Sequence, residues 1–116
     1  MKISELLSLD CRKQDALDKL KSELCEKLPF LRTKSPSDLN VELLESVLNK
    51  MESKYPVRLA YVLKGPAEDG YYSFMIKRAD NHEHIKTIYG VSMLEGFSKV
   101  VIYLYGYIKN NFKKEE

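Results

Sequence analysis

Residues 57–92 read VRLAYVLKGPAEDGYYSFMIKRADNHEHIKTIYGVS, and the period of this stretch decides the fold class. It holds three runs, 57–64, 71–78 and 84–89, in which apolar or β-branched residues recur at every second position. That period is typical of β-strands, because successive side chains of a strand point to opposite faces of a sheet. Short polar turns separate the runs, so the strands must pair as an antiparallel meander, since parallel neighbours need a crossover of about a dozen residues.

The alternation also predicts which face of the sheet is buried. In the first two runs the expected core positions are Val57, Leu59, Tyr61, Leu63, Tyr72, Phe74 and Ile76. The third run is ambiguous, because Ile85, Thr87 and Tyr89 share one face while Lys86 and Ile88 share the other. A register slip of one residue exchanges the two faces, so the sequence leaves open which of them meets the core.

Helices are expected on both sides of the strands, where the apolar period lengthens to between three and four. The pattern predicts helices over 13–28, 37–54 and 92–111. One further helical turn is expected to contain Ile3, Leu6 and Leu7. Side chains that can accept hydrogen bonds from the first helical N–H groups precede the three longer helices. These expected caps are Asp10, Ser35, and Ser92 together with Glu95.

These elements predict an α+β domain in which two N-terminal helices and one apolar C-terminal helix pack on a three-stranded antiparallel meander. The length of 116 residues suits one such domain. Within it we distinguish an N-terminal helical extension (1–34), an α-β-β-β-α unit (35–112) and a charged tail (113–116).

The predicted last helix has an unusually wide apolar arc, so it is expected to be buried on two sides. Either the sheet and the first two helices cover it within one chain, or a second copy of the chain does, and Gly96 and Gly106 permit a close approach in both cases. Tyr103, Tyr105 and Tyr107 cannot share one helix face. At least one is therefore expected to reach solvent or a partner, which makes these tyrosines candidate partner-binding residues.

Composition narrows the class of protein. The net charge of +2 is too small to indicate a nucleic-acid or membrane partner by itself. No window reaches 18 uncharged apolar residues, and Glu5 and Asp10 lie where a secretory leader would be basic and then apolar, so a soluble cytoplasmic protein without a membrane partner is expected. Cys11 and Cys25 would lie about 21 Å apart on one helix, too far for a disulfide, and are expected to be reduced thiols.

No catalytic signature of adequate specificity occurs, so we predict a protein that is not an enzyme and needs no cofactor. The segment 80–84 places Asp80, His82 and His84 at alternate positions, which would suit half of a zinc site. A structural zinc ion needs four ligands, however, and both cysteines lie in a distant element. A solvated hairpin turn without a metal is the preferred interpretation.

Basic residues are concentrated in the part of the chain that contains the strands. Residues 50–109 hold nine Lys or Arg against six Asp or Glu, whereas residues 1–49 hold eight against nine. Arg58, Lys77 and Lys86 are expected on the sheet face away from the core, with Met75 or Tyr71 among them, a mixture that single-stranded nucleic acid uses for backbone attraction and base stacking. The candidate nucleic-acid-binding residues are Arg58, Lys64, Lys77, Lys86 and Lys99.

The order helix, strand, strand, strand, helix over residues 38–111 resembles the double-stranded RNA-binding domain. Residues 64–66, Lys-Gly-Pro, lie in the first hairpin, where that family has a loop that enters the minor groove. Tyr72 corresponds to the family's aromatic residue on the second strand, and Gly90 with Ser92 corresponds to the Gly-x-Ser that opens its last helix.

This sequence departs from the family at the residues that would hold RNA. The paired lysines at the start of the family's last helix fall on Met93 and Leu94, and its loop histidine falls on Glu68. The resemblance therefore implies RNA binding only through Lys64, Lys99 and the outer face of the 37–54 helix.

The same order of elements, with residues 88–92 leading into the apolar helix, also resembles small single-domain proteins of bacteriophages and other mobile elements, including ABA-sandwich domains. That resemblance implies a non-enzymatic interaction module.

We therefore predict a small non-enzymatic cytoplasmic binding module that occupies a partner's surface through its last helix and its exposed sheet face. The expected partner is another protein or a second copy of the chain. The alternative is a nucleic-acid-binding protein that uses a basic sheet face.

Overall fold

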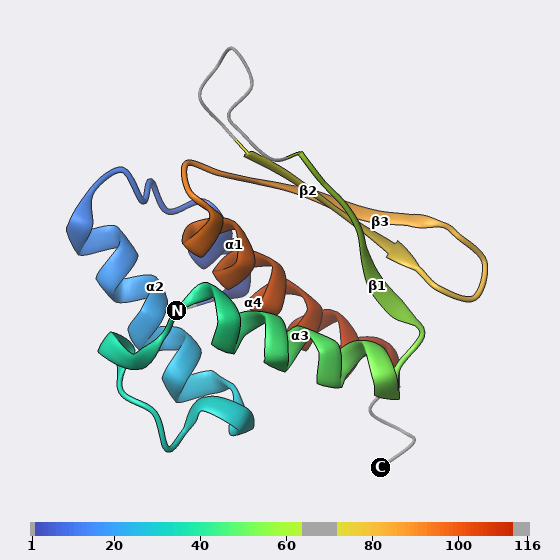
Figure 1. Cartoon of the computed structure of the whole chain (residues 1–116), viewed down its shortest axis with the longest axis horizontal. Coiled ribbons are helices and arrows are strands. Elements are labelled where there is room, and N and C mark those ends of the chain that lie inside the picture. Colours follow the sequence, from blue (N-terminus) through green and yellow to red (C-terminus); the bar gives the residue numbers. More distant parts are fainter. Residues whose placement is uncertain (1, 64–71, 113–116) are drawn as a thin grey trace.

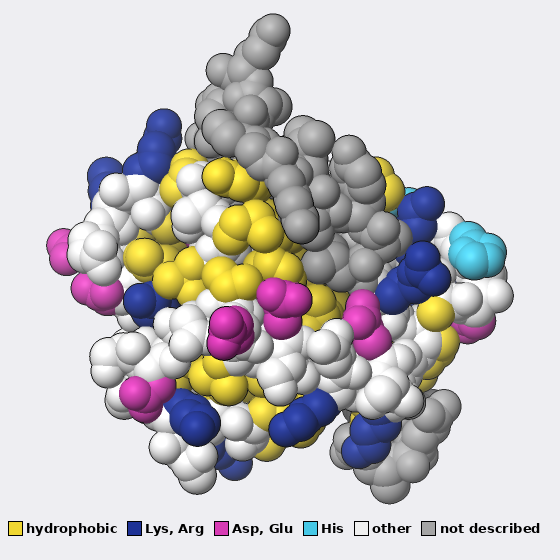
Figure 2. All heavy atoms as spheres, in the orientation of Figure 1, with side chains coloured by type: hydrophobic (Ala, Val, Ile, Leu, Met, Phe, Trp, Pro, Cys, Tyr) yellow, Lys and Arg dark blue, Asp and Glu magenta, His cyan; other side chains and the backbone are white. Residues whose placement is uncertain are grey.

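The helices of this chain are layered on one face of a three-stranded sheet (Figure 1). A computed structural model describes residues 2–63 and 72–112, and Figure 2 shows the types of side chain on one face of the molecule. In chain order the α-helices and strands are α1 (Ile3–Leu7), α2 (Gln14–Lys27), α3 (Val41–Lys54), β1 (Val57–Leu63), β2 (Tyr72–Arg78), β3 (His84–Gly90) and α4 (Met93–Phe112). Two short 3-10 helices, Pro29–Leu31 and Pro36–Asp38, lie between α2 and α3. The predicted α+β class and the antiparallel meander are confirmed.

Strand β2 is central in the sheet, and β1 and β3 both run antiparallel to it. Phe74 of β2 lies opposite Ile88 of β3, and both side chains are buried. Together with the buried Ile76 they define the inner face of the sheet, which meets the helices. The structure thus decides the ambiguity of the third strand, because Ile88 faces the core while Tyr89 is exposed.

Strand β1 departs from the expected alternation. Its register with β2 shifts between Leu59 and Tyr61, where one extra residue interrupts the ladder. Leu59 pairs with Ile76 of the inner face, whereas Tyr61 pairs with Met75, which belongs to the opposite face. The pairing of β1 with β2 therefore does not keep the unbroken alternation that the sequence predicts for Leu59, Tyr61 and Leu63, whose side chains lie outside the described part of the structure.

Helix α4 lies between the sheet and the other helices, and it contacts β2, β3, α1, α2 and α3 (Figure 1). Every residue from Glu95 to Ile102 is buried, so the first half of the helix is covered around almost its whole circumference. The wide apolar arc seen in the sequence is therefore satisfied within one chain, and a second copy is not required to cover it.

One continuous core joins the helices to the sheet. It includes Leu6 of α1, Leu24 of α2, Leu44 of α3 and Val101 of α4, all of which are fully buried. Burial of side chains of this size contributes about 1.5–3 kcal/mol each to the hydrophobic driving force for folding. Within the described ranges, no helix is long and apolar enough to cross a membrane.

One expected helix cap, Asp10, is wrong, whereas the one at Ser35 is formed, through a capping box with Asp38, but opens a different helix. Asp10 does not cap α2; its carboxylate instead accepts hydrogen bonds from the backbone and guanidinium of Arg12, because α2 begins only at Gln14. Ser35 opens the 3-10 turn Pro36–Asp38, and α3 begins later, where the side chain of Asn40 accepts a hydrogen bond of 2.8 Å from the Leu43 N–H.

The third expected cap, at the start of α4, is confirmed in part. The Ser92 hydroxyl oxygen accepts a 3.1 Å hydrogen bond from the Glu95 N–H, as a capping box requires. The Glu95 carboxylate, however, accepts from the N–H of Val91 at 2.7 Å rather than from that of Ser92. This carboxylate lies in the first turn of the helix, where the helix dipole favours negative charge.

Candidate binding surface

The sheet has a second face, which none of the described helices covers (Figure 1). The strand register places seven residues with described side chains on it, and we call this set the outer face: Arg58, Ser73, Met75, Lys77, His84, Thr87 and Tyr89. All of these side chains are half-buried or exposed, and Tyr89 is 56% exposed. Among the described residues, none packs over the outer face as the helices pack over the inner face, so the outer face is the candidate surface for a partner.

A row of three basic side chains crosses the outer face at one end. Arg58 of β1 pairs with Lys77 of β2, and Lys77 pairs in turn with His84 of β3. The His84 Nε2 atom lies 2.8 Å from the Thr87 hydroxyl oxygen, which holds the imidazole on the outer face. We call Arg58, Lys77 and His84 the basic row.

The electrostatics of the basic row favour an anion. Like charges directly opposite each other on neighbouring strands are destabilising, and Arg58 and Lys77 are such a pair. No Asp or Glu belongs to the outer face as the described residues define it. In the nearby turn, Asp80 is held by the guanidinium of Arg78 at 3.0 Å, and this hydrogen bond lowers the pKa of the Asp80 carboxyl.

Two of the five predicted nucleic-acid-binding residues, Arg58 and Lys77, are brought together in this row. Lys86 is not with them, because it pairs with the buried Ile76 and so lies on the inner side of the sheet, where it lines a groove together with Ser8. The bulge at Ile85 and the burial of Ile88 fix that orientation. The predicted grouping of Arg58, Lys77 and Lys86 is therefore wrong, and Lys64 lies outside the described residues.

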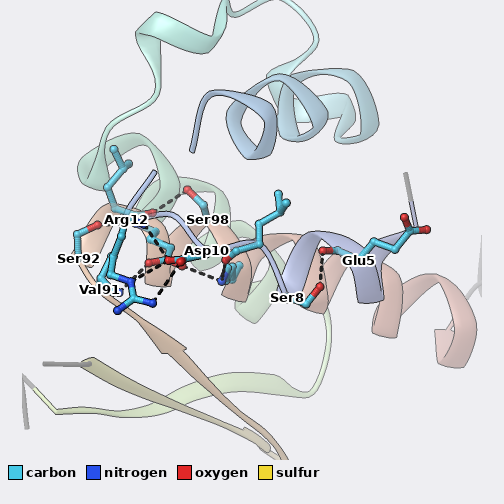
Figure 3. A network of polar contacts seen from close by, with 11 residues as sticks. Glu5, Ser8, Asp10, Arg12, Val91, Ser92 and Ser98 are labelled. Carbon is cyan, nitrogen blue, oxygen red and sulfur yellow. Dashed lines mark hydrogen bonds and ion pairs between the residues drawn. The ribbon is translucent and has the colours of Figure 1, made fainter. Parts of the chain in front are cut away.

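Lys99 is also unsuitable as a nucleic-acid contact, since its side chain is buried in the interior. Its ammonium lies 2.7 Å from a carboxylate oxygen of Glu95 and donates a 2.9 Å hydrogen bond to the backbone carbonyl of Leu9. The two charged side chains are only 4–5% exposed. This buried pair joins α4 to the segment between α1 and α2. Figure 3 shows a polar network in which Asp10 and Arg12 of that segment lie near Val91 and Ser92.

Cys11 lies beside this ion pair, and its surroundings favour the protonated thiol. Burial of the thiol, followed in importance by the negative charge of Glu95, raises the pKa of Cys11 to about 11. Cys11 and Cys25 are both buried and free, as the sequence predicted. Because the folded state holds the thiol proton more tightly, this group contributes stability that is present below its ordinary pKa of 9.0 and is lost as the pH rises through about 11.

We expect Cys11 in a Cys25→Ala variant to react with iodoacetamide at pH 8 about 100-fold more slowly in the native protein than in urea, because the thiolate is the nucleophile. Mass spectrometry of timed samples measures both rates. Equal rates in the native and unfolded protein would contradict the assigned environment of this thiol.

The three tyrosines of α4 are half-buried and make contacts within the chain. The rings of Tyr103 and Tyr107 stack at 6.5 Å, and the Tyr107 hydroxyl oxygen accepts a 3.2 Å hydrogen bond from Arg78. Burial raises the pKa of the Tyr103 hydroxyl. The ring of Tyr105 lies 5.4 Å from the ammonium of Lys109. These contacts give the tyrosines intramolecular roles, and the most exposed aromatic side chain among the described residues is that of Tyr89, which sequence reasoning did not select.

Two of the candidate zinc ligands, Asp80 and His84, bond to other side chains of this protein. Asp80 is engaged by Arg78, and His84 contacts Thr87. In the portions of the chain that are described, no group of three or more His, Cys, Asp and Glu side chains is arranged to hold a metal ion. His84 instead completes the basic row, a role that depends on the β2–β3 register and has no signal in the local sequence.

Comparisons with known proteins give no relative for this chain: no family model, curated protein or solved structure matches it. The resemblances to the double-stranded RNA-binding domain and to ABA-sandwich proteins therefore stay predictions. Of the residues through which the first resemblance implies RNA binding, Lys99 is buried and Lys64 lies outside the described residues.

Proposed function

We propose that this chain is a small non-enzymatic binding module that occupies a partner's surface with the outer face of its sheet. The observation that carries the proposal is the basic row, Arg58, Lys77 and His84, which crosses a sheet face on which the described residues include no Asp or Glu. A surface of this kind attracts an anion, and single-stranded nucleic acid is the partner class that it favours.

The rest of the outer face supports the same partner class. Tyr89 is exposed at the opposite end of the face, and Met75 and Thr87 lie between it and the basic row. An exposed aromatic ring can stack on a base, while cations a few residues away neutralise phosphates. An open sheet with this combination is a common platform for single strands.

A protein partner is the second candidate. It is favoured by the exposure of Tyr89, since aromatic residues are enriched at protein interfaces. The resemblance to small interaction modules of mobile elements supports it as well. Binding to the two classes of partner differs in its dependence on salt concentration and on the charge of the basic row, so binding measurements can distinguish them.

Fluorescence anisotropy of labelled 20-nucleotide single-stranded RNA and DNA, and of the matching duplexes, tests the proposal. We expect single strands to bind best and affinity to fall about 10-fold between 50 and 200 mM salt, as neutralisation of two or three phosphates requires. The double variant Arg58→Glu/Lys77→Glu should remove binding and flatten the salt dependence.

The matched control is Lys19→Glu/Lys86→Glu, which changes the net charge equally with exposed lysines that lie off the outer face. It should bind within about threefold of the wild type. If both double variants lose affinity equally, attraction is due to net charge and the basic row is not the site. If no probe binds at low salt, the nucleic-acid assignment is wrong and the protein partner becomes the leading candidate.

A further inference from the structure

The helical side of the molecule carries a second basic surface, which is separate from the outer face of the sheet. A groove of about 420 Å³ opens where the start of α1, the end of α2 and the last turns of α4 meet. Four cationic side chains line it, namely Lys2, Lys27, Arg32 and Lys109. We call this site the basic groove.

The fold brings these four cations together from three separate parts of the chain. Among the described residues, no Asp or Glu lines the groove. The Lys27 ammonium lies 4.0 Å from a carboxylate oxygen of Glu23. The ammonium of Lys109 lies over the ring of Tyr105. Four like charges around one groove repel each other, and a bound anion would relieve that repulsion.

Helix dipoles explain only part of this arrangement. Lys27 and Lys109 lie in the last turns of α2 and α4, where a cation is favourable. Lys2, in contrast, lies at the N-terminal end of α1, where the dipole disfavours positive charge, and Arg32 follows the 3-10 helix Pro29–Leu31. The convergence of all four therefore points to a ligand and not to helix stabilisation alone.

We propose that the basic groove binds a ligand with several phosphate groups. The planar guanidinium of Arg32 suits bidentate contact with phosphate, and the lysines supply further charge. The groove also presents the Asn110 side-chain amide and the Tyr105 ring, which would meet the non-phosphate part of a nucleotide. Inorganic triphosphate and a nucleoside triphosphate share the required chemistry. This proposal does not depend on the function proposed for the outer face.

Isothermal titration calorimetry with sodium tripolyphosphate and with ATP, at 50 mM salt, tests the groove. We expect saturable binding of one ligand per chain. The double variant Arg32→Glu/Lys109→Glu should weaken binding at least 10-fold. The matched control, Lys19→Glu/Lys86→Glu, reverses two exposed charges that lie outside both the groove and the outer face, and it should bind within about twofold of the wild type. Circular dichroism confirms that both variants are folded.

The two probes distinguish the sources of the phosphate. Tighter binding of ATP than of tripolyphosphate, with the difference lost in Tyr105→Ala, supports a nucleotide site. Equal affinities that both depend on Arg32 and Lys109 support a site for phosphate chains alone. The proposal is overturned if neither probe binds saturably, if the groove variant binds as the wild type does, or if both double variants lose affinity equally.

Discussion

Replacing Lys99 with methionine should destabilise the protein by about 4 kcal/mol, because removal of one partner from a buried ion pair leaves the other charge uncompensated. Glu95 would keep its hydrogen bond from the Val91 N–H but lose its cation, and its carboxylate is 4% exposed. Leu9 would also lose the hydrogen bond to its carbonyl. A loss of this size is a large fraction of the 5–15 kcal/mol that is typical of a domain.

Urea denaturation followed by circular dichroism measures this loss. The double variant Glu95→Gln/Lys99→Met should recover at least half of it, because a neutral amide can still accept from Val91 without leaving a buried charge. Lys19→Met, an exposed lysine of α2, is the control and should stay within about 0.5 kcal/mol of the wild type. A Lys99→Met protein as stable as this control would show that the pair is not buried.

The same variant has a local readout. Lys99 links α4 to Leu9, which is 90 positions away in the sequence. Without that link, amide hydrogens near Cys11 should exchange with solvent faster than those of α3. Hydrogen exchange followed by mass spectrometry therefore separates loss of this tether from a uniform loss of stability.

Replacing Gly96 with alanine should also be strongly destabilising, with a net loss of about 3 kcal/mol. A β-carbon at this position would lie 1.9 Å from the Cε1 atom of Phe74. The Phe74 ring is fully buried and packs edge-on against Phe97 at 5.5 Å, so it has no space to withdraw. The clash outweighs the gain of about 1 kcal/mol that alanine offers over glycine in a helix.

Gly106→Ala is the matched control, because it makes the same change in the same helix. Its β-carbon would meet only the Cδ1 end of Ile3 at 2.5 Å, a flexible side-chain terminus that can move. We expect this variant to differ from the wild type by less than about 1 kcal/mol. The double variant Phe74→Leu/Gly96→Ala should lose less stability than the sum of the losses in the two single variants, because leucine at position 74 leaves room for the new β-carbon. If the stability losses of the two single variants simply add in the double variant, positions 74 and 96 are not in direct contact.

The order and type of the elements followed from the sequence because they depend on local periods. The period of two in the strands, the prolines that end the helices and the apolar arc of α4 are properties of short stretches. They sufficed for the antiparallel meander and for Phe74 and Ile76 as core residues. The starts of α2 and α3 were misplaced because Asp10 and Ser35 have capping side chains but serve other turns.

The candidate sites depended on information that no short stretch contains. Bulges in β1 and β3 decide which residues share a face. Lys86 was predicted to lie beside Arg58 and Lys77, but the structure places His84 there instead. The sequence predicts Lys99 as an exposed cation, whereas in the structure it is 4% exposed and donates to the carbonyl of the remote Leu9.

What the sequence by itself determined is therefore the list of elements, their order and the antiparallel pairing, since hydrophobic period and turn length act over a few residues. The tertiary structure alone decided the faces of the strands, the burial of the Glu95–Lys99 pair and the convergence of Lys2, Arg32 and Lys109 on one groove. The physical reason is that charge burial and strand register are settled by partners far away in the chain.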